Sequence, residues 1–362
     1  MTTSAPGSRS IHPLSQPAFP FDDGAYAAPR WLANRHAQTI WPALVLRGPR
    51  LRYRRERWAT PDDDFIDLDW AEPAASAGSA AGSAAGITAP APPPAAPSMI
   101  APPGVPPLVA LFHGLEGSSA SHYARALMAA TLARGWRGVV VHWRGCSGEP
   151  NRLARAYHSG DSTEVDWVLR RLRPNFVAGV SLGANALLKW LGEQGSAAGF
   201  IQAAAGVSAP QQLRDGAVAL RSGFNRVYNW NFLLTMKRKS VAKLARFPDA
   251  FDRERMLAAR DFFDFDDAVT APLHGFASAE DYWACSSCRQ YLGGIAVPTL
   301  VLNALNDPFL PPSALATPAE VGPAVTLDYP KDGGHVGFAR GGPPGRIDWL
   351  PQRLLGYFAR HA

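Results

Sequence analysis

The sequence predicts an α/β fold built around a mostly parallel, doubly wound β-sheet. From residue 108 onward, short apolar runs typical of buried strands alternate with segments of helical spacing, and this alternation is the pattern of βαβ units. The length of 362 residues suits one large domain that carries an insertion. The apolar fraction of 47% is normal for a globular protein.

Each element follows from a local pattern. Strands are expected at 51–60 and 65–70, around the turn 61–64, and then at 108–112, 137–143, 175–180, 201–207, 297–303 and 325–329. Helices are expected at 121–134, 161–172, 182–193 and 346–360.

Three segments depart from this alternation. Residues 1–28 are rich in Pro, Ser, Gly and Ala and predict an irregular extension ahead of the main domain, 29–362. Residues 71–107 have the same bias, with Glu72 as their one charged residue, and predict a flexible insertion between two strands. Residues 210–292 carry helical signals and many aromatics, which predict a helical cap after the sixth strand.

Charge and cysteine content narrow the function classes. The net charge is +6, and no nucleic-acid-binding motif accompanies the short basic runs, so no nucleic-acid partner is expected. Three cysteines do not make a disulfide framework, which favours a reducing, cytoplasmic location. Cys285 and Cys288 have CxxC spacing but supply only two ligands, so no metal site is expected.

The sequence predicts neither a signal peptide nor a transmembrane segment. Residues 1–20 lack the basic and then apolar regions of a signal peptide. No run of about 18 apolar residues predicts a transmembrane segment. Oligomeric state cannot be inferred from the sequence.

The motif Gly179-Val180-Ser181-Leu182-Gly183 indicates a nucleophilic serine. It stands between a predicted strand and a predicted helix, where a sharp turn would expose the Ser181 hydroxyl, and Gly179 and Gly183 would leave room for that turn. A serine hydroxyl is a weak nucleophile until a base removes its proton. The motif therefore calls for a histidine and an acid elsewhere in the chain.

Candidate partners follow in the chain order Ser, Asp, His that α/β-hydrolases use. Asp307 comes after the strand at 297–303, and His335 comes after the strand at 325–329. The carboxyl ends of parallel strands are where catalytic groups of such sheets gather. Asp332 is a competing acid, but it lies only three residues before His335 and would have to fold back on it.

An oxyanion hole requires two backbone N–H donors aimed at the developing negative charge. One donor is expected from Leu182, next to the nucleophile. The second is expected from Leu115, in the glycine-containing loop after the strand at 108–112.

The chain resembles the YheT-type α/β-hydrolases, bacterial esterases related to eukaryotic lipid-acting hydrolases and to yeast ethyl-ester-forming acyltransferases. The resemblance covers about residue 29 to the C-terminus, apart from 71–107. It rests on the segments PRWLANRHAQTI (29–40), HGLEGS (113–118), RGCSGEPN (144–151), YHSG (157–160) and GVSLGAN (179–185). It implies the α/β-hydrolase fold, a triad at Ser181, Asp307 and His335, and carboxylic esters as substrates. Hydrolysis through an acyl-enzyme on Ser181 needs no metal or organic cofactor, so none is expected.

These observations favour hydrolysis of carboxylic esters, with short- to medium-chain acyl esters or lipids as substrates, through an acyl-enzyme on Ser181. Transfer of the acyl group to an alcohol is the second hypothesis, and a non-catalytic scaffold is the third; the complete set of triad residues argues against the scaffold. Aromatic residues of the cap could line an acyl pocket. Its basic residues Lys237, Arg238, Lys239, Lys243 and Arg246 suggest a solvated face or weak contact with an anionic membrane surface.

Overall fold

The computed structural model describes residues 24–46, 48–73 and 104–362. Most of the predicted extension 1–28 and of the predicted insertion 71–107 lies outside the described residues. The core is an eight-stranded sheet in the order β1-β2-β4-β3-β5-β6-β7-β8. The strands are β1 (Arg52–Ala59), β2 (Phe65–Glu72), β3 (Leu108–Phe112), β4 (Arg137–Val141), β5 (Phe176–Val180), β6 (Ala203–Val207), β7 (Thr299–Leu302) and β8 (Val325–Asp328).

The prediction of a mostly parallel sheet is confirmed. Only the pairs β1–β2 and β2–β4 are antiparallel, and the five remaining neighbouring pairs are parallel. In register, Phe112 of β3 lies beside Gly179 of β5, and Leu302 of β7 lies beside Asp328 of β8. The loops that follow these strands therefore leave the sheet at one edge.

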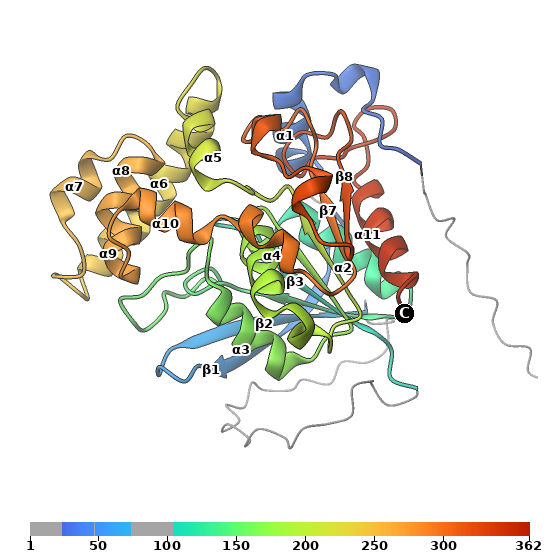
Figure 1. Ribbon diagram of the computed structural model, residues 1–362, viewed down its shortest axis with the longest axis horizontal. Coiled ribbons are helices and arrows are strands. Elements are labelled where there is room, and N and C mark those ends of the chain that lie inside the picture. Colours follow the sequence, from blue (N-terminus) through green and yellow to red (C-terminus); the bar gives the residue numbers. More distant parts are fainter. Residues whose placement is uncertain (1–23, 47, 74–103) are drawn as a thin grey trace, which may run out of the picture.

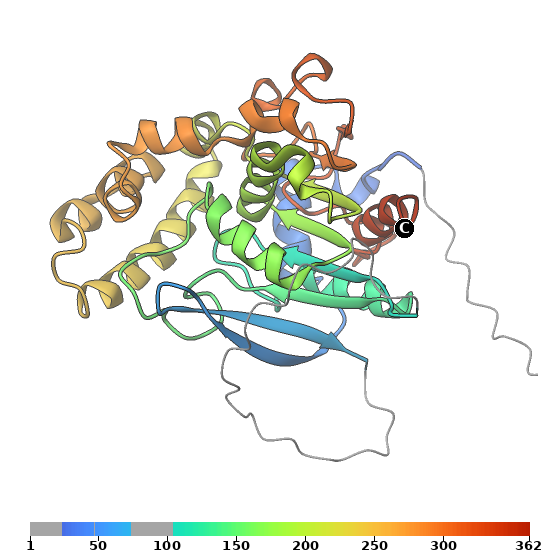
Figure 2. The ribbon, with the colours of Figure 1, turned by 60° about the horizontal axis from the view of Figure 1, so that its bottom comes forward.

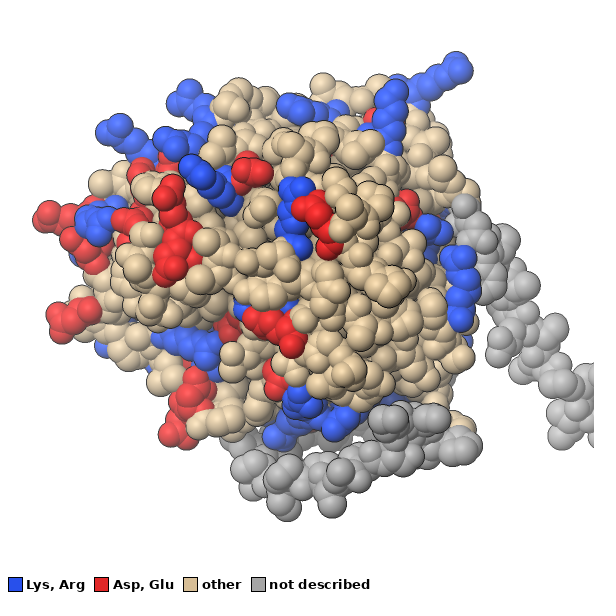
Figure 3. Space-filling view, in the orientation of Figure 1, with Lys and Arg blue, Asp and Glu red and all other residues tan. Residues whose placement is uncertain are grey.

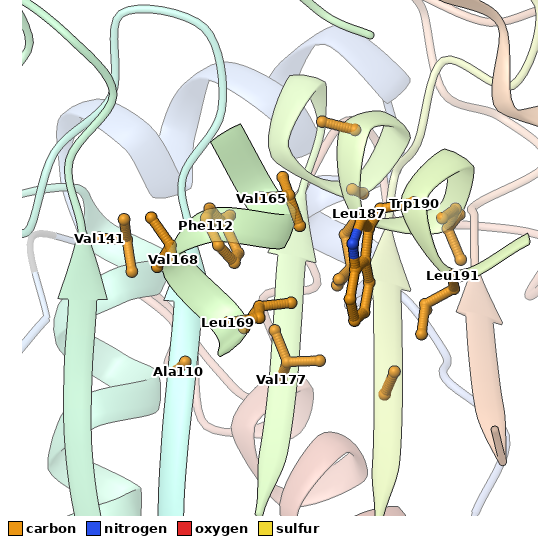
Figure 4. Packing of buried hydrophobic residues seen from close by; sticks show 14 of the residues in the cluster. Ala110, Phe112, Val141, Val165, Val168, Leu169, Val177, Leu187, Trp190 and Leu191 are labelled. Atoms are coloured by element: carbon orange, nitrogen blue, oxygen red, sulfur yellow. The ribbon is translucent and has the colours of Figure 1, made fainter. Parts of the chain in front are cut away.

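Helices cover both faces of the sheet (Figures 1 and 2). The helices α3 (Ser162–Leu172) and α4 (Leu182–Gln194) pack on one face, and α2 (His122–Ala133) and α11 (Trp349–Ala359) pack on the other. Alternate residues of β3 point to the two faces, so Ala110 and Phe112 join the α3–α4 side, which Figure 4 shows. Because both faces are covered, the central strands are apolar along their whole length.

The chain between β6 and β7 is mainly helical and forms a separate lobe beside the sheet, here called the cap (Figure 1). Its helices are α5 (Leu213–Leu220), α6 (Asn225–Leu244), α7 (Arg253–Ala258), α8 (Phe262–Phe265), α9 (Ala271–His274) and α10 (Ala279–Ser286). Phe251 and Phe265 pack in a small core of the cap, whereas Phe224, Trp230 and Phe263 are exposed. Some aromatic side chains of this segment thus pack the interior of the cap, and others lie on its surface.

One helix, α1 (Arg35–Leu44), is not among those that the sequence predicts. Pro42 stands inside it and masks its helical pattern. The available signal was Asn34, whose side chain accepts hydrogen bonds from the backbone N–H groups of His36 (2.8 Å) and Ala37 (3.2 Å). Ahead of it, Tyr26 is buried and donates a hydrogen bond to the carbonyl of Ala339 (2.6 Å).

Charge is mixed over the face of the molecule shown in Figure 3, where Lys and Arg side chains alternate with Asp, Glu and uncharged residues. In the part of the chain that the structure describes, no helix is both long and apolar enough to cross a membrane. The lack of a nucleic-acid partner stays a prediction from the sequence.

Truncation of Leu187 tests the packing of α4 on the sheet. Its side chain is fully buried between α4 and the strands. We expect Leu187→Ala to lower the free energy of unfolding by about 2–5 kcal/mol because it removes buried methyl groups and leaves a cavity. The control Val218→Ala, at a side chain that is 56% exposed, should change it by about 0.5 kcal/mol or less. Urea unfolding followed by circular dichroism measures both, and equal effects would contradict this packing.

Candidate functional site

The candidate nucleophile Ser181 sits on a sharp turn between β5 and α4. Its backbone has φ 53° and ψ −119°, which is an uncommon conformation for a residue with a side chain. A Cβ on Gly179 would lie 2.5 Å from the carbonyl oxygen of Gly183, and one on Gly183 would lie 2.6 Å from that of His113. Only glycine fits at these two positions, as the sequence motif requires.

The structure brings Ser181, Asp307 and His335 together. Nε2 of His335 lies 3.0 Å from Oγ of Ser181, and Nδ1 of His335 lies 2.8 Å from Oδ2 of Asp307. The other carboxylate oxygen of Asp307 accepts a hydrogen bond from the backbone N–H of Phe309 (2.8 Å). The Asp307 side chain is fully buried and that of His335 is 11% exposed, so the imidazole is held between the two groups with little contact with water.

Asp332, the competing acid, forms a hydrogen bond with Asn306 rather than with His335. Its Oδ1 accepts a hydrogen bond from Nδ2 of Asn306 (2.9 Å). Asn306 Oδ1 in turn accepts from the backbone N–H of Gly334 (2.9 Å). Asp332 therefore belongs to the hydrogen-bond network that shapes the loop after β8 that carries His335, here called the histidine loop, while Asp307 contacts the imidazole itself.

Helix α1 supports the histidine loop through two side chains. The backbone N–H of His335 donates to Oγ1 of Thr39 (2.9 Å), and that of Gly333 donates to Oε1 of Gln38 (2.8 Å). Both side chains are buried. Sequence reasoning did not assign either residue to the site, although both lie in the 29–40 segment that carries the family resemblance.

The two predicted oxyanion-hole donors lie next to the nucleophile. Leu182 is the first residue of α4, so its N–H is among the four donors that a helix leaves without an intrahelical acceptor. A Cβ on Gly114 would lie 3.1 Å from Cβ of Ser181, which places the loop of Leu115 against the serine. Within the described part of the chain, no group accepts a hydrogen bond from the Leu115 N–H.

The loop of Leu115 is fixed by buried polar contacts. The N–H groups on either side, of Gly114 and Glu116, each donate to a tyrosine hydroxyl at 2.9 Å, that of Tyr123 and that of Tyr157. Nδ1 of His113 donates to the Gly114 carbonyl (2.8 Å), and its Nε2 accepts from the Trp143 backbone N–H (3.3 Å). Burial lowers the pKa of His113 to about 3, so this histidine is neutral and structural.

A cavity of about 100 Å³ lies beside Ser181 and His335, between the sheet and the cap. Its walls are mostly apolar. They include Leu213, Leu220, Phe232, Phe262, Phe309 and Leu310, together with Leu115 and Leu182. An apolar cavity at a serine hydroxyl suits a hydrocarbon chain attached to a carbonyl group.

The cysteines do not suggest a second reactive centre. Burial raises the pKa of Cys146 to about 11, so its thiol stays protonated at neutral pH. Cys285 is exposed while Cys288 is buried. Among residues 24–46, 48–73 and 104–362, no three His, Cys, Asp or Glu side chains cluster in a way that could hold a metal ion.

Comparison with known proteins agrees with this architecture. Residues 107–341 match the family described as "alpha/beta hydrolase fold". An Escherichia coli protein named "Putative esterase YheT" is 36% identical over 90% of each chain. A mouse protein named "Phospholipase ABHD3" is 28% identical over 92% of this chain and 78% of its own length.

A yeast protein named "Medium-chain fatty acid ethyl ester synthase/esterase 2" is 29% identical, over 64% of this chain and 58% of its own. The predicted fold and the resemblance to YheT-type proteins are thus confirmed. The chain belongs to the α/β-hydrolase fold family, and its relatives include proteins whose names describe an esterase and a phospholipase.

Proposed function

We propose that this protein hydrolyses carboxylic esters through an acyl-enzyme on Ser181. The observation that carries the proposal is the pair of contacts at His335: Nε2 lies 3.0 Å from Oγ of Ser181, and Nδ1 lies 2.8 Å from a buried carboxylate oxygen of Asp307. This is the arrangement in which a histidine can take the serine proton while an acid holds its tautomer.

The reaction proceeds in two steps. Oγ of Ser181 attacks the ester carbonyl as His335 takes its proton, and the backbone N–H groups of Leu115 and Leu182 stabilise the oxyanion. His335 then gives the proton to the departing alcohol. Water then attacks the acyl carbonyl as His335 takes its proton. The bond to Oγ of Ser181 breaks, His335 returns the proton to that oxygen, and the carboxylic acid leaves. Asp307 orients the imidazole and stabilises its charged form.

The acyl group would occupy the apolar cavity beside Ser181. Its modest volume of about 100 Å³ favours short to medium acyl chains over long ones. Both Phe232 of the cap and Phe309 line this space. The ring of Phe309 lies 4.2 Å from that of His335, measured between centroids. Phe309 would therefore contact both the acyl chain and the catalytic histidine.

Transfer of the acyl group to an alcohol is the second candidate function. It uses the same acyl-enzyme and differs only in the molecule that attacks it, and one relative carries both "synthase" and "esterase" in its name. Incubation of an ester with and without added ethanol, followed by product analysis, separates the two. If the ethyl ester is the main product even at a low concentration of ethanol, acyl transfer is the favoured function.

Replacement of the nucleophile is the first test. Ser181→Ala should lower ester hydrolysis by about 10⁴-fold or more and abolish labelling by a fluorophosphonate probe, because the attacking hydroxyl is gone. Labelling followed by gel fluorescence measures this, with unchanged far-UV circular dichroism as the folding control. Activity that survives the change would exclude Ser181. Wild-type protein that neither labels nor turns over esters would support the scaffold hypothesis.

The acid is tested by a matched pair. Asp307→Asn should lower kcat by about 10³- to 10⁴-fold, because the imidazole loses its orienting charge. Asp332→Asn should have a much smaller effect, since Asp332 contacts Asn306 rather than the imidazole. Steady-state kinetics on a p-nitrophenyl ester decide. A greater loss in Asp332→Asn would mean that the acid is misassigned.

Thr39 is proposed as a positioning residue that acts through the His335 backbone. Thr39→Val removes the acceptor for the His335 N–H and should lower kcat by about ten-fold with little change in KM, since a buried donor left without a partner costs roughly 1–3 kcal/mol. Thr39→Ser keeps the hydroxyl and should restore the rate. Equal losses of kcat in both variants would show that Thr39 contributes packing alone.

A further inference from the structure

A second and larger cavity, of about 520 Å³, lies between α6 and the loop 144–157. We call it the α6 cavity. Leu115, whose N–H is a proposed oxyanion donor, lines both this cavity and the apolar one beside Ser181. An ester bound at Ser181 could therefore reach past Leu115 into the α6 cavity.

One face of α6 spans both cavities. Phe232, Met236, Lys239 and Lys243 follow each other at intervals of three or four residues and so share that face. Phe232 lines the cavity beside Ser181, whereas the other three line the α6 cavity. At 1.5 Å per residue, Phe232 and Lys243 are about 16 Å apart along the helix. The character of the face changes from apolar to cationic over that distance.

Four cations line the α6 cavity, and two of them have carboxylate partners. Lys239 contacts Glu116 at 2.9 Å. Arg144 is held by three carboxylates, those of buried Glu164 (2.5 Å) and Asp64 (3.1 Å) and that of exposed Asp62 (2.8 Å).

The other two cations, Lys243 and Arg246, have no carboxylate partner within the described part of the chain, and their hydrogen bonds go to uncharged oxygens. Nζ of Lys243 donates to Oδ1 of Asn151 (3.0 Å) and to two backbone carbonyls, at 2.9 and 3.1 Å. The guanidinium of Arg246 donates to two backbone carbonyls, at 2.7 and 2.8 Å. The one remaining acid of the lining, Glu149, is paired with Arg57 at 3.0 Å.

The titration of Lys243 reflects its burial first and the neighbouring charges second. Burial lowers the pKa of its ammonium group to about 8. The Asp64 carboxylate opposes this shift in pKa, and three further positive charges add to it, those of Arg246, Arg144 and Lys239. An anion placed in the cavity would relieve this repulsion.

Apolar side chains form another part of the cavity wall, among them Met236, Phe251, Phe265, Val269 and Leu273. A cavity with an apolar wall and two cations lacking acidic partners suits an amphiphile that carries one anionic group. We propose that the α6 cavity binds the anionic end of an ester substrate, a phosphate or a carboxylate on the alcohol part, at Lys243 and Arg246. That the ligand is an ester whose carbonyl reaches Ser181 rests on the proposed function; the anion site itself does not.

A purely structural role is the competing explanation. Lys243 and Arg246 bond to residues 151–155 and could simply tie the cap to the main domain. Such a tie would be insensitive to ligand charge. The test must therefore compare charged with neutral ligands in the same variants.

The first arm measures binding without chemistry. Isothermal titration calorimetry on the full chain compares octyl phosphate and octanoate with neutral octanol, in wild type, Lys243→Met, Arg246→Gln and Arg238→Gln. Wild type should bind at least one of the two anions more tightly than octanol. Lys243→Met and Arg246→Gln should each weaken that binding by about ten-fold, because each removes one positive charge that attracts the anion. Whichever anion shows the loss identifies the group.

Arg238→Gln is the matched control. Arg238 is exposed on the same helix and is not part of the cavity lining, so its loss removes one positive charge elsewhere and should leave anion binding unchanged. Thermal unfolding of each variant shows whether it is folded. If Lys243→Met does not fold, Arg246→Gln alone carries the test, because Arg246 is exposed and its replacement disturbs the packing less. Anion binding that is absent in wild type, or equal in all folded variants, would overturn the proposal.

The second arm measures turnover. The ratio of kcat/KM for 1-octanoylglycerol 3-phosphate to that for 1-octanoylglycerol should exceed one in wild type and fall about ten-fold in Arg246→Gln. A wild-type preference for the neutral ester would overturn the substrate assignment. If neither ester is cleaved but octyl phosphate binds through Lys243 and Arg246, the anion site stands and the proposed hydrolase activity fails.

Discussion

The close approach of α4 to β3 and β5 is the constraint on which the candidate site depends. Any side chain at Gly179 or Gly183 would collide with backbone atoms, so the turn between them can form only because both are glycine. The turn holds Ser181 in a backbone conformation that few residues adopt. Buried contacts of α4, through side chains such as Leu187 and Trp190, supply the free energy that keeps this turn in place.

The histidine loop is also held in an uncommon backbone conformation, but by other contacts. Val336 and Phe338 have φ values of 60° and 41°. Phe338 is fully buried and packs edge-on against Tyr26, with ring centroids 5.3 Å apart. The loop is fixed further by hydrogen bonds that its backbone N–H groups donate, from His335 to Thr39 of α1 and from Val336 to Oγ of Ser208 (3.2 Å). The site thus depends on an N-terminal segment far from it in the sequence.

How far the sequence could predict this structure follows from the range of each interaction. The parallel strands and the order Ser181, Asp307, His335 could be predicted because hydrophobic runs and glycine placement are local signals. The sequence favoured Asp307 over Asp332 on chain spacing alone, because contact of either acid with the imidazole depends on where two loops meet in space. For the same reason, the sequence did not reveal that Gln38 and Thr39 would accept hydrogen bonds from the histidine loop. The boundaries drawn at 28, 71–107 and 210–292, and the cytoplasmic location, stay predictions.

The basic residues of the cap show what the fold adds. In the sequence, Lys237, Arg238, Lys239, Lys243 and Arg246 form one cationic stretch that could face solvent or a lipid surface. In the fold they separate. Lys237 donates to two carbonyls at the end of α7 (2.7 and 2.6 Å), Arg238 is exposed, and the last three line the α6 cavity. Weak membrane contact stays a prediction, with less free charge available for it than the sequence suggests.

If the α6 cavity holds the anionic end of the substrate as proposed, the position of α6 gives the cap a physical means of selecting substrates. A single face of this helix lines both cavities, so the distance between the apolar and the cationic part is set by the helix rather than by a mobile loop. A substrate that places a hydrocarbon chain at Phe232 and an anion near Lys243 satisfies both ends at once, whereas a short neutral ester satisfies one. Because each end contributes separately, changes in the cap could shift substrate preference without moving Ser181, Asp307 or His335. Chemistry and selectivity would then reside in different parts of the fold.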